Sequence, residues 1–160
     1  MTVDDLEAYG TERMDDEEIT QLLSNQDTGV LALPTEGAPS MRPLSFYFDG
    51  ESAIYFVYII GAGSRKAELS ETADVARLLV YTTDTASNWR SVLLTGTINR
   101  VTESETNRLE TALETGRPDA LKRAMESERT ELYRFDIEDR SGIKHLGLPP
   151  GFDSDESGTA

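Results

Sequence analysis

Six short apolar segments, separated by polar stretches containing glycine, proline and aspartate, set the strongest limit on how this chain folds. Two of the segments alternate apolar and polar residues, as Leu44, Phe46 and Phe48 do, while the others are compact runs rich in aliphatic, β-branched and aromatic residues. Both patterns are typical of β-strands. The six predicted strands are 28–33, 40–48, 52–60, 74–82, 89–101 and 131–138.

The connections between these segments indicate a barrel. Asp49-Gly50 is a strong hairpin signal, and strands joined by hairpins argue against a doubly wound parallel sheet. Gly96 lies in the middle of the fifth strand and predicts the bulge or bend that a barrel corner needs. We therefore predict a mainly β fold, in which six mostly antiparallel strands and a few short helices form a small barrel.

The helices are predicted from their first turns. Acidic residues from Asp15 to Glu18 precede Ile19, Leu22 and Leu23, which predicts a helix at about 15–25. Ser64 is a plausible N-cap for a short helix at 65–72. A Ser/Thr-to-Glu capping box at 102–105 opens a third helix that ends at Gly116, and Pro118 opens a fourth to about 126.

The charge of the chain is concentrated at its ends. The 160 residues carry 30 acidic and 15 basic side chains, for a net charge of -15. Residues 1–18 hold eight acids and one base (-7) and residues 151–160 hold three acids (-3), which leaves -5 for residues 19–150. We expect an acidic, disordered tail at 1–13, one domain at 14–148 and a second acidic, disordered tail at 149–160.

Composition excludes several classes of function. The chain has no cysteine and one histidine, which rules out disulfides, thiolate chemistry and a multi-histidine metal centre within one chain. No apolar run is long enough for a membrane span, and the acidic N-terminus lacks the pattern of a signal peptide, so we expect a soluble cytoplasmic protein. A charge of -15 also makes nucleic acid an unfavourable partner.

Lysine is rare among the basic residues. Only 3 of the 15 are lysine, and this pattern, with the acid excess, resembles proteins of salt-accumulating halophilic archaea. Molar salt shortens the Debye length to about 3 Å, which removes most of the self-repulsion of such a chain. The alternative is an ordinary acidic protein with disordered acidic ends.

Four groups of residues could carry chemistry. Ser64, Arg65 and Lys66 follow a glycine turn and open a helix, an arrangement that could hold a phosphate or could be a capped helix with two solvated cations. Arg42 beside a proline in the second strand could bind a ligand or be an exposed strand arginine. Trp89, the single tryptophan, could stack on a planar ligand or pack in a core or interface. His145 has no motif around it and is expected at the surface.

Taken in order, these motifs resemble the flavin-binding split-barrel proteins related to pyridoxamine 5′-phosphate oxidase. The resemblance covers roughly residues 14 to 140. It rests on the opening helix before Gly29-Val30-Leu31-Ala32, on Arg42-Pro43-Leu44-Ser45 before Asp49-Gly50, on Ile54-Tyr55-Phe56, on Ser64-Arg65-Lys66, and on Trp89-Arg90-Ser91-Val92 before Gly96.

The resemblance implies a six-stranded split barrel that forms a homodimer, with FMN in clefts at the interface. It would place Ser64, Arg65, Lys66 and Arg42 at the FMN phosphate. Pro43, Leu44 and Ser45 would line the phosphate and the isoalloxazine, and Tyr58 and Ile59 would follow as flavin contacts. Trp89 and Ser91 would reach the ring from the partner subunit.

The chain also differs from the oxidase itself, and this difference limits the activity that the resemblance implies. The oxidase itself has a tryptophan- and arginine-containing C-terminal segment for its substrate, and no matching tryptophan exists here, so pyridoxamine phosphate oxidation is not expected. We expect an FMN-dependent oxidoreductase acting on an unknown small molecule or electron acceptor, without a recognisable catalytic acid or base. The alternatives are a flavin carrier or sensor without turnover, or the same fold binding deazaflavin or haem.

Overall fold

The computed structural model describes residues 10–59, 75–102, 104–107 and 130–146 of the chain. All six predicted strands are present, together with the predicted first helix. The elements are β1 (Thr11–Arg13), α2 (Asp16–Asn25), β2 (Thr28–Leu33), β3 (Ser40–Phe48), β4 (Ala53–Ile59), β5 (Ala76–Thr85), β6 (Asn88–Arg100) and β7 (Thr130–Leu146). The described start of the helix predicted after Thr102 is helical at 104–107, whereas most of it and the helices predicted at 65–72 and 118–126 lie outside the described residues.

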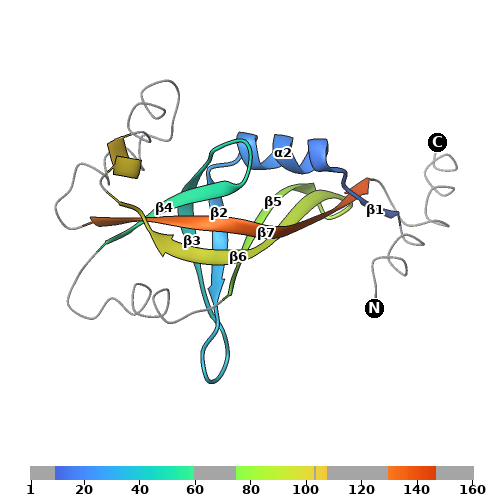
Figure 1. The fold of residues 1–160 in the computed structure, drawn as a ribbon. Coiled ribbons are helices and arrows are strands. Elements are labelled where there is room, and N and C mark those ends of the chain that lie inside the picture. The colour runs from blue at the N-terminus through green and yellow to red at the C-terminus, as the bar shows by residue number, and fades with distance from the viewer. Residues whose placement is uncertain (1–9, 60–74, 103, 108–129, 147–160) are drawn as a thin grey trace, which may run out of the picture.

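The sheet closes on itself. Its strand order is β1-β7-β4-β3-β2-β5-β6, and β7 also pairs with β6, so the last six strands form a closed antiparallel barrel with β1 added beside β7 (Figure 1). The predicted mainly β, antiparallel six-stranded barrel is therefore confirmed. Closure removes the exposed strand edges that an open sheet would present.

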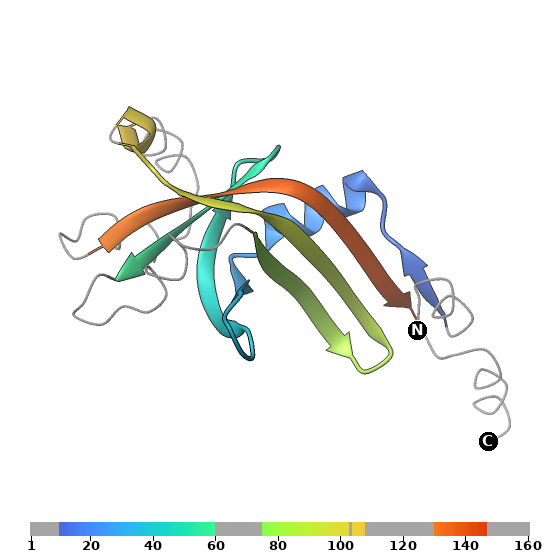
Figure 2. The ribbon, with the colours of Figure 1, turned by 60° about the horizontal axis from the view of Figure 1, so that its bottom comes forward.

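β7 is much longer than predicted, and β1 was not predicted. The sequence predicts that the last strand ends at residue 138 and that residues 11–13 belong to an acidic tail. In the structure β7 continues to Leu146, and Thr11 to Arg13 pair with its far end, beside which β1 lies in Figure 2. Residues 139–146 are polar and contain a glycine, but β6 supplies them with a complete pairing partner from Asn88 to Thr95.

The core fills the barrel and reaches the underside of α2. Phe46, Phe56 and Phe135 are fully buried inside the barrel, and Ile19 and Leu23 of α2 pack into the same cluster. Asp15 is the N-cap of the helix: its side chain accepts the Glu18 N–H at 2.8 Å while the Glu18 side chain accepts the Asp15 N–H, a capping box that was not predicted. The helix lies across one side of the barrel (Figure 1). None of the described helices is long and apolar enough to cross a membrane.

Gly96 marks an irregularity in the longest strand pairing, as the sequence predicts. Thr95 pairs with Asp139 while Gly96 pairs with Ile137, so Glu138 is an extra residue on β7. A β-carbon at Gly96 would lie 2.0 Å from the backbone oxygen of Asp136, so glycine is required by this close approach of two backbones.

An ion pair anchors α2 to the barrel. The Lys144 Nζ of β7 lies 2.6 Å from the Glu18 Oε2 at the start of the helix, and the two side chains are mostly shielded from solvent. The hydrogen bond from Lys144 lowers the pKa of the Glu18 carboxyl, although partial burial opposes the shift. The same carboxylate thus serves both the helix cap and the contact between helix and barrel.

We predict that Gly96→Ala strongly destabilises the protein. Because the new methyl group meets backbone atoms that cannot move aside, we expect the free energy of unfolding to fall by about 3 kcal/mol or more. Gly37→Ala is the matched control, since a β-carbon there meets nothing within 4 Å. Denaturant unfolding of both variants measures the difference, and equal stability of the two would contradict the prediction.

We predict that the contact between Glu18 and Lys144 makes stability fall at acid pH. A carboxyl whose pKa is lowered on folding stabilises the protein above its unfolded pKa, and this contribution is lost as pH falls through the folded value. Unfolding should therefore become easier between about pH 5 and about pH 3 by a larger increment in the wild type than in Lys144→Met. Denaturant melts at each pH compare the two, and parallel pH curves would show that the ion pair contributes nothing.

Candidate functional site

The strands β3, β2, β5 and β6 share one continuous face on the outside of the barrel. Paired residues of neighbouring strands point to the same side of a sheet. Because Leu31, Leu78 and Leu94 point into the core, the alternate residues point outward. This outer sheet face consists of Thr28, Val30 and Ala32 of β2, Met41, Pro43 and Ser45 of β3, Arg77, Leu79, Tyr81 and Thr83 of β5, and Trp89, Ser91, Leu93 and Thr95 of β6.

The middle of the outer sheet face is apolar and partly exposed. Val30 pairs with Leu79, which pairs with Leu93, and the three form a row across β2, β5 and β6. Met41 and Tyr81 beside this row are 50% and 53% exposed. No residue of the outer sheet face is acidic, in a chain whose net charge is -15. Such a surface is suited to burial against another apolar surface.

The candidate residues of β3 lie at one end of this face. Pro43 and Ser45 point outward and are exposed, whereas Leu44 points to the other side and packs partly against the core. Arg42 follows the inward alternation opposite Leu31, yet its side chain is exposed, and its Nη1 donates to the Met41 carbonyl at 2.9 Å. Among the described residues no carboxylate forms an ion pair with Arg42. Its guanidinium is accessible to a ligand.

The candidate residues of β6 lie at the other end of the outer sheet face. Trp89 pairs with Thr83 of β5, and Ser91 pairs with Tyr81, so both point out of the barrel. The two strands β2 and β5 separate them from β3. Three steps between neighbouring strands amount to roughly 14 Å along the sheet. One chain therefore does not bring Pro43 and Ser45 together with Trp89 and Ser91.

The remaining predicted residues are described only in part. Tyr58 and Ile59 form the end of β4, where their backbones pair with Glu131 and Thr130 of β7. Ser64, Arg65 and Lys66, the predicted phosphate group, lie outside the described residues. Their assignment to a ligand stays a prediction from the sequence.

His145 is buried, and the expectation that it lies at the surface was wrong. It is 7% exposed, because the extension of β7 places it between β1 and β6, opposite both Thr11 and Trp89. Its ring stacks on the Trp89 indole with centroids 5.8 Å apart and planes inclined by 20°, and the Thr11 Oγ1 lies 3.4 Å from its Nδ1. No local pattern predicts this contact, because the strand that creates it was predicted to end seven residues earlier.

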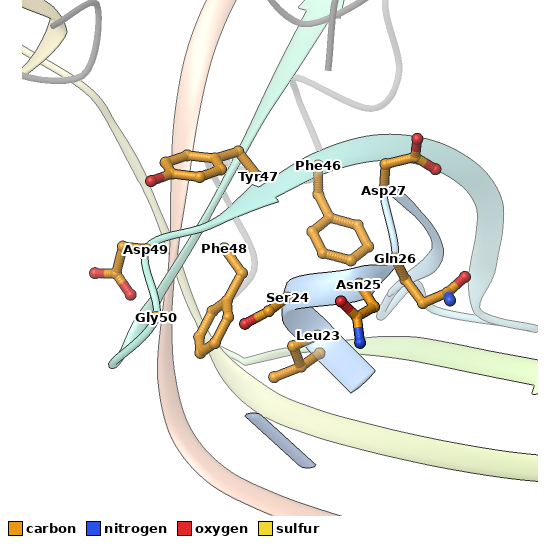
Figure 3. Close-up of a pocket in the computed structure, with 10 residues that line it drawn as sticks. All are labelled: Leu23, Ser24, Asn25, Gln26, Asp27, Phe46, Tyr47, Phe48, Asp49 and Gly50. Carbon is orange, nitrogen blue, oxygen red and sulfur yellow. The ribbon is translucent and has the colours of Figure 1, made fainter. Parts of the chain in front are cut away.

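A cavity of about 410 Å³ opens between the C-terminal end of α2 and the β3–β4 hairpin (Figure 3). Phe46 and Phe48 form its apolar part, while Asp27 and Asp49 lie at its rim. Asp49 also holds the hairpin turn, because its Oδ1 accepts the N–H groups of residues 51, 52 and 53. The lining contains two carboxylates and no cation, so it does not suit a phosphate, and none of the predicted site residues lines it.

The described residues contain no cluster of metal ligands. Within them, no group of three or more histidine, aspartate or glutamate side chains is placed to hold a metal ion.

Comparison with known proteins agrees with the fold and the motif order. Residues 15–144 match the family model described as pyridoxamine 5′-phosphate oxidase. A FAD-binding protein from Mesorhizobium loti superposes with a TM-score of 0.67 at 18% identity, covering 85% of this chain and 97% of that one. No curated protein matches the sequence.

Two further solved structures have a similar fold. A flavocytochrome from Azotobacter vinelandii superposes with a TM-score of 0.67 at 18% identity over 94% of this chain and 76% of that one. A protein from Mycobacterium smegmatis described as binding FAD and haem gives 0.64 at 17% identity, over 94% of this chain and 80% of that one. At these identities the similarity establishes the shared split-barrel architecture.

Proposed function

We propose that this chain, which belongs to the pyridoxamine 5′-phosphate oxidase family, binds a flavin between two copies of itself and uses it to oxidise or reduce a small molecule. The observation that carries the proposal is the arrangement of the outer sheet face. The residues expected to contact the flavin lie at its two opposite ends, with an apolar, acid-free surface between them.

A two-fold symmetric dimer would complete the site. In such a dimer the same surface of both copies packs together, and the two copies run in opposite directions. If the row formed by Val30, Leu79 and Leu93 lies near the axis, the β3 end of one copy meets the β6 end of the other. Two equivalent sites result, each with β3 from one copy and Trp89 and Ser91 from its partner.

The residues available fit a flavin. A flavin phosphate carries about two negative charges, and Arg42 together with Arg65 and Lys66 would neutralise them by charge-assisted hydrogen bonds. The outward backbone and side chains of Pro43 and Ser45 would meet the flat ring, and the indole of Trp89 would stack at its edge. FMN fits this short set of contacts, whereas the similar structures from Mesorhizobium loti and Mycobacterium smegmatis are described as binding FAD.

The flavin itself supplies the hydride or electron transfer. The outer sheet face contains no carboxylate and no histidine, so its side chains bind and orient rather than transfer protons. We therefore propose a small acceptor or donor that exchanges electrons with the ring directly. Oxidation of pyridoxamine phosphate is not proposed, because the chain has no tryptophan after Trp89.

A flavin carrier or sensor is the second candidate, and the same lack of an acid–base pair on the outer sheet face favours it. Reduction of the bound flavin by NADH or NADPH, followed by reoxidation by an added acceptor, separates an enzyme from a carrier. The acid excess and the scarcity of lysine support a salt-rich cytoplasm as the working environment, so binding is best measured in high salt.

We predict that the purified protein is yellow in high salt and that Arg65→Ala/Lys66→Ala loses the flavin. Removing two cations from the phosphate should lower flavin affinity by at least tenfold. Arg140→Ala is the control, since Arg140 donates to the Glu51 carbonyl and its pairing with Leu94 places it on the opposite side of the sheet from the outer sheet face.

Visible absorption and the mass of the released cofactor measure the outcome. They distinguish FMN, FAD, deazaflavin and haem from one another. A colourless protein that binds neither FMN nor FAD on titration would refute the proposal, as would equal flavin loss in Arg140→Ala and in the double variant.

We predict that Tyr81→Glu separates the dimer and weakens flavin binding together. Tyr81 is 53% exposed in one chain, so the change should leave the barrel folded while placing an extra charge in the proposed interface. We expect a shift from dimer to monomer in size-exclusion chromatography and an at least tenfold lower flavin affinity, because half a site remains.

Gln21→Glu is the matched control. It adds the same charge at an exposed position of α2, on another part of the molecule. A wild-type monomer with tight, stoichiometric flavin would contradict the shared site, and so would a Tyr81→Glu monomer with unchanged affinity.

A further inference from the structure

The single histidine and the single tryptophan of the chain are in contact. They face each other across the β6–β7 pairing, where Trp89 and His145 are direct partners. Their rings stack with centroids 5.8 Å apart and an angle of 20° between the planes. One face of the indole is thus covered by the imidazole, and a ligand can meet Trp89 only through the other face or an edge.

The imidazole is held from its other side by β1. Thr11 is the direct partner of His145 in the β1–β7 pairing and is itself 3% exposed. Its hydroxyl lies 3.4 Å from the Nδ1 of His145. Three neighbouring strands therefore fix a row of side chains in the order Thr11, His145 and Trp89.

We propose that His145 is a positioning residue for Trp89, fixing the orientation of the indole that completes the partner's flavin site. This inference rests on the proposed function, because it concerns the same site. Without the imidazole, the indole can rotate about its side-chain bonds and loses the geometry that a flat ring requires.

The charged residues around His145 can be named strand by strand. On β1 they are Glu12 and Arg13, on β6 Arg90, and on β7 Lys144. Strand alternation places Glu12, Arg90 and Lys144 on the opposite side of the sheet, where Lys144 is paired with Glu18 of α2. Arg13 lies two residues from Thr11 on the side that His145 occupies.

The contact that orients Trp89 is an aromatic stack between the two rings. Such a stack has a preferred offset geometry, so it restricts the angle at which the indole lies.

The first test measures the mobility of the indole. Trp89 is the only tryptophan, so its emission reports one site. We expect faster depolarisation of this emission in His145→Ala than in the wild type, and wild-type depolarisation in His145→Phe, which keeps an aromatic ring on the indole. Equal depolarisation in the wild type and in His145→Ala would overturn the proposal.

The second test measures flavin affinity by titration of FMN into the dimer at pH 8. We expect His145→Ala to weaken FMN binding by about three- to tenfold, His145→Phe to retain it, and the emission of Trp89 in His145→Ala to show faster depolarisation. Far-ultraviolet circular dichroism and size-exclusion chromatography confirm that both variants stay folded and dimeric.

The two tests distinguish failure of the positioning role from failure of the proposed function. If the wild type binds no flavin, the proposed function is refuted and the claim about the flavin site falls with it, while the depolarisation of the Trp89 emission still reports whether His145 orients the indole. If the wild type binds FMN and His145→Ala binds it equally well, the proposed function stands and the positioning role is refuted.

Discussion

The double pairing of β7 is the constraint on which the rest of the structure depends. Its first part, from Thr130 to Asp136, pairs with β4, and nearly its whole length from Tyr133 to Leu146 pairs with β6. This one strand joins the two ends of the sheet, so the backbone hydrogen bonds of both edges are satisfied internally. Its far end also carries Lys144 to α2 and His145 to Trp89, which ties the helix and the candidate site to the same closure.

Closure gives the sheet a packed inner face and an outer face that is partly exposed to solvent. The inner face is filled by fully buried side chains such as Phe46, Val80 and Phe135 and has no room for a ligand of flavin size. The ligand must therefore bind on the outside or at a rim. The outer sheet face combines exposed apolar residues with an absence of acidic ones, so the proposed flavin contacts and the proposed dimer interface fall on the same surface.

The sequence predicted the strands and the first helix well because their signals are local. Alternation between Leu44 and Phe48, the Asp49-Gly50 turn and the acidic first turn of the helix each depend on residues a few positions apart. Gly96 also signalled its bulge correctly. The extension of β7 and the existence of β1 were missed, since residues 139–146 become a strand only through partners about fifty residues away on β6.

The residues of the candidate site come from the motif order, and their role in a site stays a prediction. The register shows that four of them, Pro43, Ser45, Trp89 and Ser91, share one face. Their separation across β2 and β5 followed from topology, which no single motif encodes. The contact between His145 and Trp89 could not be predicted, because it joins two residues 56 positions apart through a strand that the composition disguises as a loop.

The uneven charge of the chain bears on how two such copies could meet. Each copy carries -15, so approach is opposed over most of the surface by repulsion. The outer sheet face contains Arg77 and no carboxylate, which makes it a place where the repulsion between two copies is locally low. Arg42 lies on the other side of β3 from this face, and among the described residues no carboxylate forms an ion pair with it. The acid-free surface therefore bears on the proposed association of two copies, and a mutation that introduced a carboxylate there would oppose that association electrostatically.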